Sequence, residues 1–345
     1  MKLRREILTN VRRLVVKFGS GLLTDERNRL ALPAIERLAR QVAALRADGC
    51  EVALVSSGAI AAGMGALGFT KRPQDLPSLQ AAAAVGQGKL MAAYDKAFGK
   101  LGLNVAQILL THDDLKSRHR HLAARKTLDT LLERGIIPII NENDTVAVDE
   151  IKFGDNDQLG ALTATLIDAD LLIILSHVAG LLDRKKQVVP VVAEITRDIE
   201  ALAGGTDRVT SVGGMKSKIA AAKICARAGI PMVIANGDCT GVIASVVDGD
   251  DVGTIFLQKT GKLESRKRWI AFFQKPAAIL VVDDGARAAL CDAGKSLLKK
   301  GVVSTKGKFA AGDVVSIHDA AGNEFARGLV RAGSVIVHRD DLVVL

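Results

Sequence analysis

The amino-acid sequence predicts an α/β fold of three layers, with a mostly parallel central sheet between helices, followed by a small β-rich domain. Short apolar runs of strand length alternate with amphipathic helical segments up to about residue 258. Such alternation is typical of parallel sheets that are covered on both faces. Beyond that point the helical periodicity gives way to short β-prone runs separated by glycines. This change of pattern predicts the second domain.

Size and composition agree with an ordinary globular protein of about two domains. The chain has 345 residues, of which 48% are hydrophobic and 25% are charged. No apolar run approaches the ~18 residues that a membrane-spanning helix needs. The charged N-terminal stretch MKLRREILTNVRR lacks the apolar core of a signal peptide. We therefore expect no association with a membrane.

The four cysteines, Cys50, Cys225, Cys239 and Cys291, are far apart and form no CxxC pair. Scattered cysteines in a chain of this length are typical of reduced thiols in a cytoplasmic protein. The cysteines thus predict a cytoplasmic location and no zinc site.

The elements of the first domain follow from periodicity and turn signals. Residues 32–49 repeat apolar side chains at three- and four-residue spacing, between a proline near the start and a glycine at the end, which predicts an amphipathic helix. The other expected segments, in chain order, are a strand at 13–18, a strand, turn and helix start at 52–63, an alanine-rich helix at 79–99, a strand at 104–110, a basic helix at 118–134, and strands at 135–140, 171–175 and 231–236.

The domain boundaries follow from the same change in the sequence pattern after about residue 258. Residues 1–260 are predicted to form the first domain, the charged and poorly periodic stretch 261–275 a linker, and residues 276–345 the β-rich domain, with one helix at roughly 284–293. Residues 259–308 hold twelve lysines and arginines against four acids. This basic stretch either attracts nucleic acid or other anions or is a solvated surface, and composition leaves both open.

Glycine-rich turns after the strands are the places where such sheets bind ligands. Lys17 ends the first strand and is followed by Gly19, Ser20 and Gly21. Glycines let backbone amides approach a phosphate, although a lysine at a strand end is often plain surface. Residues 212–218, VGGMKSK, place two glycines and two lysines at a helix start. That arrangement suits a phosphate, or else forms a loop with solvated lysines.

Two further turns carry polar groups. Ser56, Ser57 and Gly58 close a strand and open a helix, where the helix end can hold an anion or a serine can act as the N-cap. Residues 141–157 follow another strand and carry six acids and three asparagines in two similar blocks, NEND and GDND. The spacing does not match an EF-hand loop. The residues alone leave a solvated acidic loop and a metal cage open.

Taken together, the motifs resemble those of one family. The order VVKFGSG, VSSGAIAAG, INENDTVAVDEIKFGDND and GGMKSK is similar to that of the glutamate 5-kinases within the amino acid kinase family. The runs AAAAVGQGKLM, LESRKRWI and KSLLKKGVVSTKGKFAAGDVV match as well. The last run resembles the C-terminal PUA domain of many bacterial members. The resemblance covers nearly the whole chain and implies an amino acid kinase-like fold followed by a PUA-like domain.

The resemblance implies ATP-dependent phosphorylation of the γ-carboxylate of L-glutamate to L-glutamyl 5-phosphate, the first step of proline biosynthesis, with Mg²⁺ accompanying ATP. A carboxylate with a pKa near ~4.3 is already ionised at neutral pH, so the reaction needs no general base. The obstacle is the approach of two anions. Positioning and charge neutralisation overcome it.

The resemblance also implies roles for individual residues. Lys17 and Lys218 are expected to flank the transferred phosphoryl group, and Asp157 to orient both lysines. The residues expected to hold the glutamate are Ser57, Gly58, Asp144 and Asn156. The residues expected to contact the nucleotide are Lys17, Gly19, Ser20, Ser176, His177, Val212, Gly213, Gly214, Met215, Lys216, Ser217 and Lys218.

The sequence departs from the family in the nucleotide region. After the strand LLIIL the family usually has Thr-Asp and then GLYTADP, whereas this chain has Ser176-His177 and GLLDRKK. The family's Thr before GGM is Val212 here, and the C-terminal part is short. Because an acid and an aromatic residue are replaced, we expect an active kinase with an altered nucleotide pocket.

Several partners follow from the resemblance alone: a homo-oligomer of two or four chains, proline as a feedback inhibitor, and glutamyl phosphate reductase as the pathway partner. Two alternatives to glutamate phosphorylation remain. One is a related carboxylate kinase of the same fold. The other is an RNA-binding or regulatory PUA protein with a degenerate kinase domain. The basic stretch favours RNA, whereas the tail lacks an obvious set of aromatic residues for base stacking.

Overall fold

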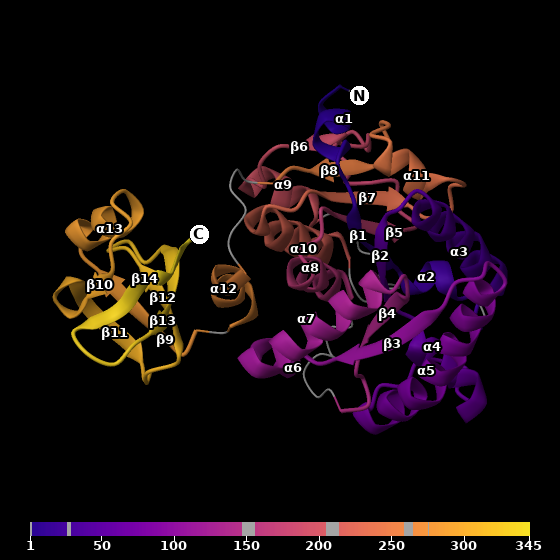
Figure 1. The fold of residues 1–345 in the computed structure, drawn as a ribbon, viewed down its shortest axis with the longest axis horizontal. Helices are drawn as coiled ribbons and strands as arrows, with labels where there is room; N and C mark the ends of the chain where they lie inside the picture. Colours follow the sequence, from indigo (N-terminus) through magenta and orange to yellow (C-terminus); the bar gives the residue numbers. More distant parts are fainter. Residues whose placement is uncertain (1, 26–28, 147–155, 205–213, 259–264, 275) are drawn as a thin grey trace. The chain divides into compact units, whose positions relative to one another are not determined.

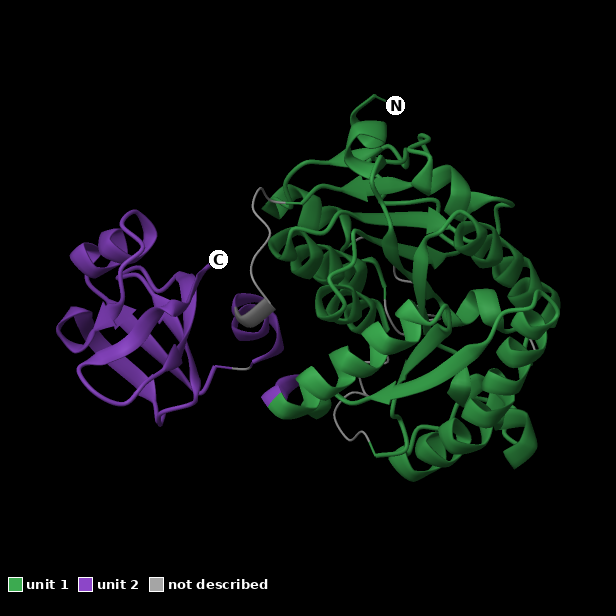
Figure 2. Cartoon of the chain, viewed as in Figure 1, with its two compact units in different colours: residues 1–114, 119–260 green, residues 115–118, 261–345 purple. Residues whose placement is uncertain are grey.

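The computed structural model describes residues 2–25, 29–146, 156–204, 214–258, 265–274 and 276–345 (Figure 1). These residues form two compact units, Met1–Asp114 with His119–Thr260 and Leu115–Arg118 with Gly261–Leu345 (Figure 2). The finer division into 1–260, 261–275 and 276–345 stays a prediction. None of the described helices is both long and apolar enough to cross a membrane.

Unit 1 is built on an eight-stranded sheet in the order β3-β4-β2-β1-β5-β7-β8-β6, with helices packed against it (Figure 1). All neighbouring strands are parallel except β7 and β8. The expected mostly parallel sheet is confirmed. Its strands are β1 Arg13–Phe18, β2 Glu51–Ser56, β3 Val105–Leu110, β4 Ile137–Glu142, β5 Leu171–Ser176, β6 Val191–Val192, β7 Met232–Asn236 and β8 Thr254–Phe256.

Most strands of this sheet are connected by helices. The longest predicted helices occur where the periodicity placed them. The helices are α1 Lys2–Leu8, α2 Ser20–Leu23, α3 Leu32–Ala47, α4 Ala59–Met64, α5 Leu76–Gly99, α6 His112–Lys116, α7 Arg118–Glu133, α8 Asn156–Leu166, α9 Arg197–Leu202, α10 Met215–Ala228 and α11 Val242–Val247, with a 3-10 turn at Gly65–Leu67.

Helix α3 shows why the sequence folds as it does. Ile35, Leu38, Val42 and Leu45 are all buried on one face of the helix, so the apolar stripe packs into the main core. The helix ends near Gly49, whose φ of 85° lies in the left-handed region that favours glycine.

The strand register brings the predicted ligand turns to one edge of the sheet. Phe18 at the end of β1 pairs with Ser56 of β2 on one side and with Leu175 of β5 on the other. The turns after these three strands are therefore neighbours. Parallel sheets bind ligands at this carboxyl edge.

Helices α4 and α5 approach each other through glycine. A Cβ atom on Gly63 would overlap the carbonyl oxygen of Ala82, and a Cβ atom on Gly86 would overlap that of Ala59. Only glycine fits at both positions. This close contact fixes α5 beside the turn that follows β2.

Unit 2 contains a six-stranded sheet in the order β10-β14-β13-β12-β9-β11. Only β9 and β12 pair in parallel, and the other neighbours are antiparallel. The β-rich second domain is confirmed. Its elements are α12 Ser265–Arg268, a π-helix at Trp269–Phe273, β9 Ala278–Val282, α13 Asp284–Cys291, β10 Leu297–Leu298, a 3-10 turn at Lys299–Gly301, β11 Val302–Gly307, β12 Val314–His318, β13 Glu324–Val330 and β14 Val335–Val344.

Three details of unit 2 differ from the expectation. The sequence has two separate β-prone runs, VIVH at 335–338 and LVVL at 342–345, but residues 335–344 form one strand, β14, and the sequence pattern did not indicate β10, β11 or β13. The stretch expected to be a connector contains α12 and a π-helix in which Trp269, Ile270 and Phe273 are buried.

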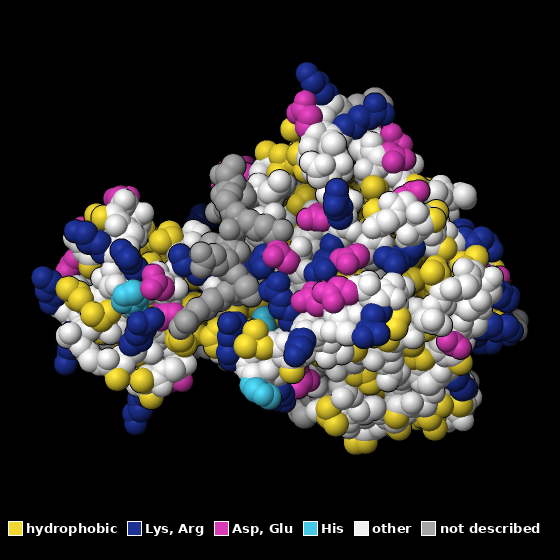
Figure 3. Space-filling model, viewed as in Figure 1, with side chains coloured by type: hydrophobic (Ala, Val, Ile, Leu, Met, Phe, Trp, Pro, Cys, Tyr) yellow, Lys and Arg dark blue, Asp and Glu magenta, His cyan; other side chains and the backbone are white. Residues whose placement is uncertain are grey.

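On the face shown in Figure 3, lysines and arginines are interspersed with acidic and apolar side chains.

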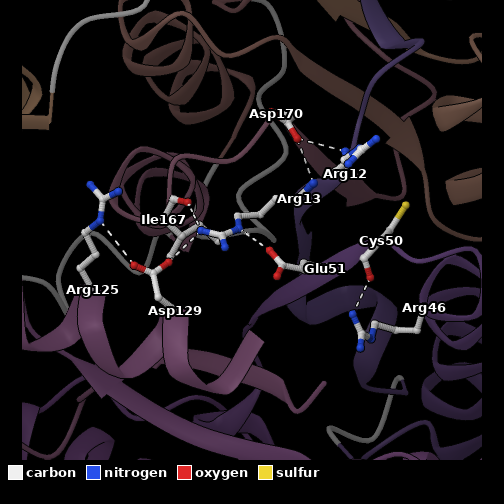
Figure 4. Close-up of polar contacts among 9 residues, drawn as sticks. All are labelled: Arg12, Arg13, Arg46, Cys50, Glu51, Arg125, Asp129, Ile167 and Asp170. Atoms are coloured by element: carbon white, nitrogen blue, oxygen red, sulfur yellow. Dashed lines mark hydrogen bonds and ion pairs between the residues drawn. The ribbon is translucent and has the colours of Figure 1, made fainter. Parts of the chain in front are cut away.

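An ion-pair network lies at the opposite, amino edge of the sheet in unit 1 (Figure 4). The guanidinium of Arg13 in β1 lies 2.6 Å from Glu51 of β2 and 2.7 Å from Asp129 of α7. It also donates to the carbonyl oxygen of Ile167. Asp170 accepts from the backbone amide of Arg13 at 2.9 Å. These contacts join two strands to α7 and lie away from the glycine turns.

Arg4 of α1 is buried, with 2% of its surface exposed. Its guanidinium donates to four backbone carbonyl oxygens, those of Pro190, Asp250, Val252 and Gly253. The first helix is thereby attached to the segments that flank β6 and β8.

Candidate active site

Asp157 is the centre of the candidate site. It lies in the first turn of α8 and is fully buried. Lys17 Nζ lies 2.5 Å from Asp157 Oδ1, and Lys218 Nζ donates to Oδ2 at 2.8 Å. Ser217 Oγ donates to Oδ2 at 2.9 Å. A strand end and the first turns of two helices therefore converge on one carboxylate.

The two lysines control the ionisation of Asp157. Burial by itself raises the pKa of this carboxyl, but the charges of Lys17 and Lys218 and their hydrogen bonds lower it below its ordinary value. Asp157 is thus ionised at neutral pH. Two ammonium groups facing one carboxylate leave a net positive charge, which favours a bound phosphate.

Asn156 holds the second part of the site together. Its amide nitrogen lies 2.8 Å from the carbonyl oxygen of Ser56, 3.0 Å from Ser57 Oγ and 2.9 Å from Asn141 Oδ1, and its two hydrogens are shared among these three acceptors. These contacts connect the start of α8 to the ends of β2 and β4. Asn156 and Asp157 are adjacent in the chain, so the two parts of the site share one helix start.

Ser57 does not cap α4, contrary to one of the two interpretations of its turn. The N-cap is Gly58, with a φ of 103° and no side-chain cap hydrogen bond. The left-handed backbone requires glycine here. It frees the Ser57 hydroxyl to accept from Asn156 instead.

Asp144 lies two residues beyond the end of β4 and is half-buried. Burial raises its pKa to about 6, and the charge of Arg72 offsets only part of that shift. A cationic group of a bound ligand would stabilise the ionised form of this carboxyl.

The predicted nucleotide residues fall into two groups. Gly19 and Ser20 lead from β1 into α2, and the Gly19 amide donates to the carbonyl oxygen of Leu175 at 3.0 Å. Gly214 is the N-cap of α10, and Met215, Lys216 and Ser217 form its first turn. Val212, Gly213 and residues 147–155 lie outside the described residues.

His177 lies beside the glycine turn after β1. A Cβ atom on Gly21 would lie 2.6 Å from His177 Nε2. His177 Nδ1 is 2.7 Å from Asp238 Oδ2, and Asp238 follows β7. An acid is therefore present in this region, but it comes from a different strand end than in the family pattern. Ser176, the last residue of β5, is half-buried.

Sequence reasoning missed several contributors. Asp238 follows a strand but belongs to no motif, and Gln87 lies in α5 within the matched run AAAAVGQGKLM, to which no role was assigned. Only the position of Asn141 directly after the apolar run of β4 was a usable signal. Among the described residues, no group of three or more His, Cys, Asp and Glu side chains could hold a metal ion.

A mostly parallel sheet with paired lysines around a buried aspartate at its carboxyl edge is suited to phosphoryl transfer, the chemistry of a kinase. The model of the amino acid kinase family matches residues 12–236, and that of the PUA domain matches residues 278–339. A solved structure, the UMP kinase from Bacillus anthracis, has a TM-score of 0.50 and 15% identity, and covers 72% of this chain and 97% of that one. That likeness shows the fold alone.

Similar proteins of known function show which group of the amino acid kinase family the chain belongs to. The chain is 46% identical to glutamate 5-kinase of Pelobacter propionicus and 47% identical to that of Geobacter sulfurreducens, in each case over 99% of this chain and 100% of the relative. For glutamate 5-kinase of Caldanaerobacter subterraneus the identity is 46%, over 96% of this chain and 98% of the relative. The chain belongs to the glutamate 5-kinase group of the amino acid kinase family.

Proposed function

We propose that this protein is a kinase that transfers the γ-phosphoryl group of ATP to the γ-carboxylate of L-glutamate. The product is L-glutamyl 5-phosphate, with which proline biosynthesis begins. The observation that carries the proposal is the pair Lys17 and Lys218 on the buried carboxylate of Asp157, in a chain similar to glutamate 5-kinases over its full length. The RNA-binding alternative finds no support in these similarities.

The reaction needs charge control more than acid–base chemistry. A γ-carboxylate oxygen forms a bond to the γ-phosphorus while the bond from that phosphorus to the bridging oxygen of ADP breaks. Lys17 and Lys218 neutralise the phosphoryl oxygens from two sides. Asp157 keeps both ammonium groups in place, because each of its oxygens is engaged by one lysine.

The amino acid would be bound next to this cluster by Ser57, Gly58, Asp144 and Asn156. Asp144 offers a carboxylate to the α-ammonium. Its raised pKa supports this role, because a buried carboxylate is stabilised by a cation bound beside it. The left-handed Gly58 leaves its backbone uncovered by a side chain. Since Asn156 precedes Asp157, the bound γ-carboxylate would be held close to the lysines.

The nucleotide would lie over the turn after β1 and the start of α10, in contact with Gly19, Ser20 and residues 212–218. His177 and Ser176 would contribute from the end of β5. Mg²⁺ supplies charge neutralisation when it is bound. It would be held by phosphate oxygens of ATP, because both oxygens of Asp157 are already occupied by lysines.

Other features of the proposal rest on the family alone. They are a dimer or tetramer, inhibition by proline, transfer of the product to glutamyl phosphate reductase, and a cytoplasmic location. All four cysteines are free thiols in the structure, which suits a reducing compartment.

The proposal is tested by measuring ADP release by the purified protein with MgATP and a panel of acids. We expect turnover with L-glutamate and little with N-acetylglutamate, aspartate or carbamate. A product trapped by hydroxylamine as the γ-hydroxamate would identify the acyl phosphate. Folded protein without glutamate-dependent ADP release would refute the function.

A further inference from the structure

A chain of side-chain amides runs from the candidate site to the edge of the sheet. Asn156 donates to Asn141 at 2.9 Å, Asn141 Nδ2 donates to Gln87 Oε1 at 2.9 Å, and Gln87 Nε2 donates to Gln107 Oε1 at 3.2 Å. We refer to these four residues, Asn156, Asn141, Gln87 and Gln107, as the amide relay. Its first three members are buried and Gln107 is exposed on β3.

Two backbone groups fix the direction of the relay. The carbonyl oxygen of Ser56 can only accept, so the Asn156 atom that contacts it must be the amide nitrogen. The amide of Glu142 can only donate, and it lies 2.9 Å from Asn141 Oδ1. Both anchors require the same orientation. The Asn141 nitrogen must then face an acceptor, and Gln87 Oε1 is that acceptor.

The consequence is a defined polarity at the site. The nitrogen of Asn156 is directed toward Ser56, Ser57 and Asn141, and within the described part of the chain no residue donates to its Oδ1. With the nitrogen so engaged, the polar atom of Asn156 that can receive a substrate donor is its carbonyl oxygen, which accepts hydrogen bonds and attracts a cation. A flipped amide would present N–H donors and would place acceptor against acceptor at Ser56.

We propose that Gln87 is a positioning residue that holds Asn141 and thereby keeps the Asn156 amide in place, so that the Asn156 oxygen receives the α-ammonium of the amino acid substrate. The inference rests on the proposed function and deepens it, because it assigns one end of the substrate to one atom. Gln87 contacts Asn141 from α5, and it is adjacent to Gly86, where α5 packs closely against α4. It acts through Asn141 and Asn156 and does not touch the substrate itself.

The test compares the binding of L-glutamate with that of glutarate, the same dicarboxylate without the ammonium group, by calorimetry. We expect the wild type to prefer glutamate by about 100-fold or more, because a site built for a polar group rejects an analogue that lacks it. In Gln87→Met, Asn141 loses its acceptor, so its side chain is held less firmly, and so is the Asn156 amide that donates to it. The preference should fall about tenfold, the value of roughly one hydrogen bond, with the affinity for ATP unchanged.

Two further variants keep the inference open to refutation. Gln87→Glu retains an acceptor for Asn141, so its preference for glutamate should stay within about threefold of wild type. Lys89→Met carries the same new side chain at an exposed position of α5 and should bind like wild type. Melting temperatures identify any variant that fails to fold.

Three outcomes would overturn the inference: glutarate and glutamate bound equally by the wild type, both acids weakened equally in Gln87→Met, or the preference lost in a folded Gln87→Glu. None of these requires turnover. A protein that prefers glutamate in binding but releases no ADP would refute the proposed function and leave the relay standing.

Discussion

Lys218 Nζ and Asp157 Oδ2 are 2.8 Å apart, although 61 residues separate them in the chain. Lys218 has only 6% of its surface exposed, and Asp157 has none. A buried ammonium is stable here because the carboxylate compensates its charge. The pair places a cation at the start of α10, beside the turn that we assign to the nucleotide.

Replacing Lys218 by alanine should lower kcat by about 100- to 1,000-fold and change the KM of glutamate little, since the ammonium acts on the charge of the transferred group. Steady-state kinetics of ADP release measure both constants. Lys223 lies on the same helix as Lys218, and Lys223→Ala removes an ion pair with Glu200 of α9. This variant is the matched control and should retain wild-type rates. An equal loss in both variants would contradict the assignment.

Asp157→Asn should also reduce kcat by about 100-fold, for a different reason. The variant keeps the size of the side chain but removes the charge that holds the two lysines. We expect the acid limb of its pH–rate profile to remain as in wild type, because the folded pKa of Asp157 lies below its ordinary value. A variant with full activity would show that the lysines need no carboxylate.

Glutamate binding should weaken in acid. Asp144 has a pKa of about 6, so its ionised form prevails above that pH and is lost as the pH falls through it. The KM of glutamate should be constant above pH ~7 and rise about tenfold per pH unit below pH ~5.5, while the substrate carboxylate stays ionised to pH ~4.3.

Asp144→Asn is the control for that pH dependence. Its KM for glutamate should be raised by about tenfold or more at pH 8 and should vary little between pH 5 and pH 7, since no carboxylate titrates. If the acidic rise of KM persisted in this variant, the titrating group would lie elsewhere.

His177 should affect ATP and not glutamate. Gly21→Ala places a methyl group 2.6 Å from His177 Nε2, so the ring must move away from the glycine turn. We expect a rise of about threefold to tenfold in the KM of ATP and an unchanged KM of glutamate. His177→Ala, which removes the ring, should relieve the effect of Gly21→Ala in the double variant. Additive effects would argue against contact through the ring.

The Arg13 network should matter for stability alone. Arg13→Met leaves Glu51 and Asp129 without their shared cation and should lower the free energy of unfolding by about 1–3 kcal/mol. Lys100→Ala removes an exposed pair with Glu36 and should change the free energy of unfolding much less than Arg13→Met does, because solvent screens the pair. Chemical denaturation measures both, and kcat should be unchanged in both.

Much of unit 1 was predictable because its signals are local. The apolar stripe of α3 and the buried run of β5 are visible in the sequence, and their order determines a parallel sheet. Strand β13 was missed because its sequence, EFARGLV, interrupts the β-prone pattern with charged residues and glycine. The buried Trp269 within a charged stretch gave no periodic signal, because a single turn is too short to show one.

The candidate site was predictable only in part. Lys17, Asp157 and Lys218 were named from the motif order, and the structure brings them together, while their chemical roles remain predictions. The roles of Asp238 and Gln87 could not be predicted, although Gln87 lies in the matched run AAAAVGQGKLM, because each acquires its partner through tertiary packing and not through spacing in the chain. Replacement of the family acid by His177 was visible in sequence, but the carboxylate beside it was not.

The attachment of Arg4 has a consequence for how the protein is made. The ribosome releases α1 first, yet its guanidinium partners include carbonyl groups at residues 250, 252 and 253, near the end of unit 1. The first helix must therefore wait, undocked, until almost the whole unit has been synthesised. Completion of the last strand is the event that secures the beginning of the chain.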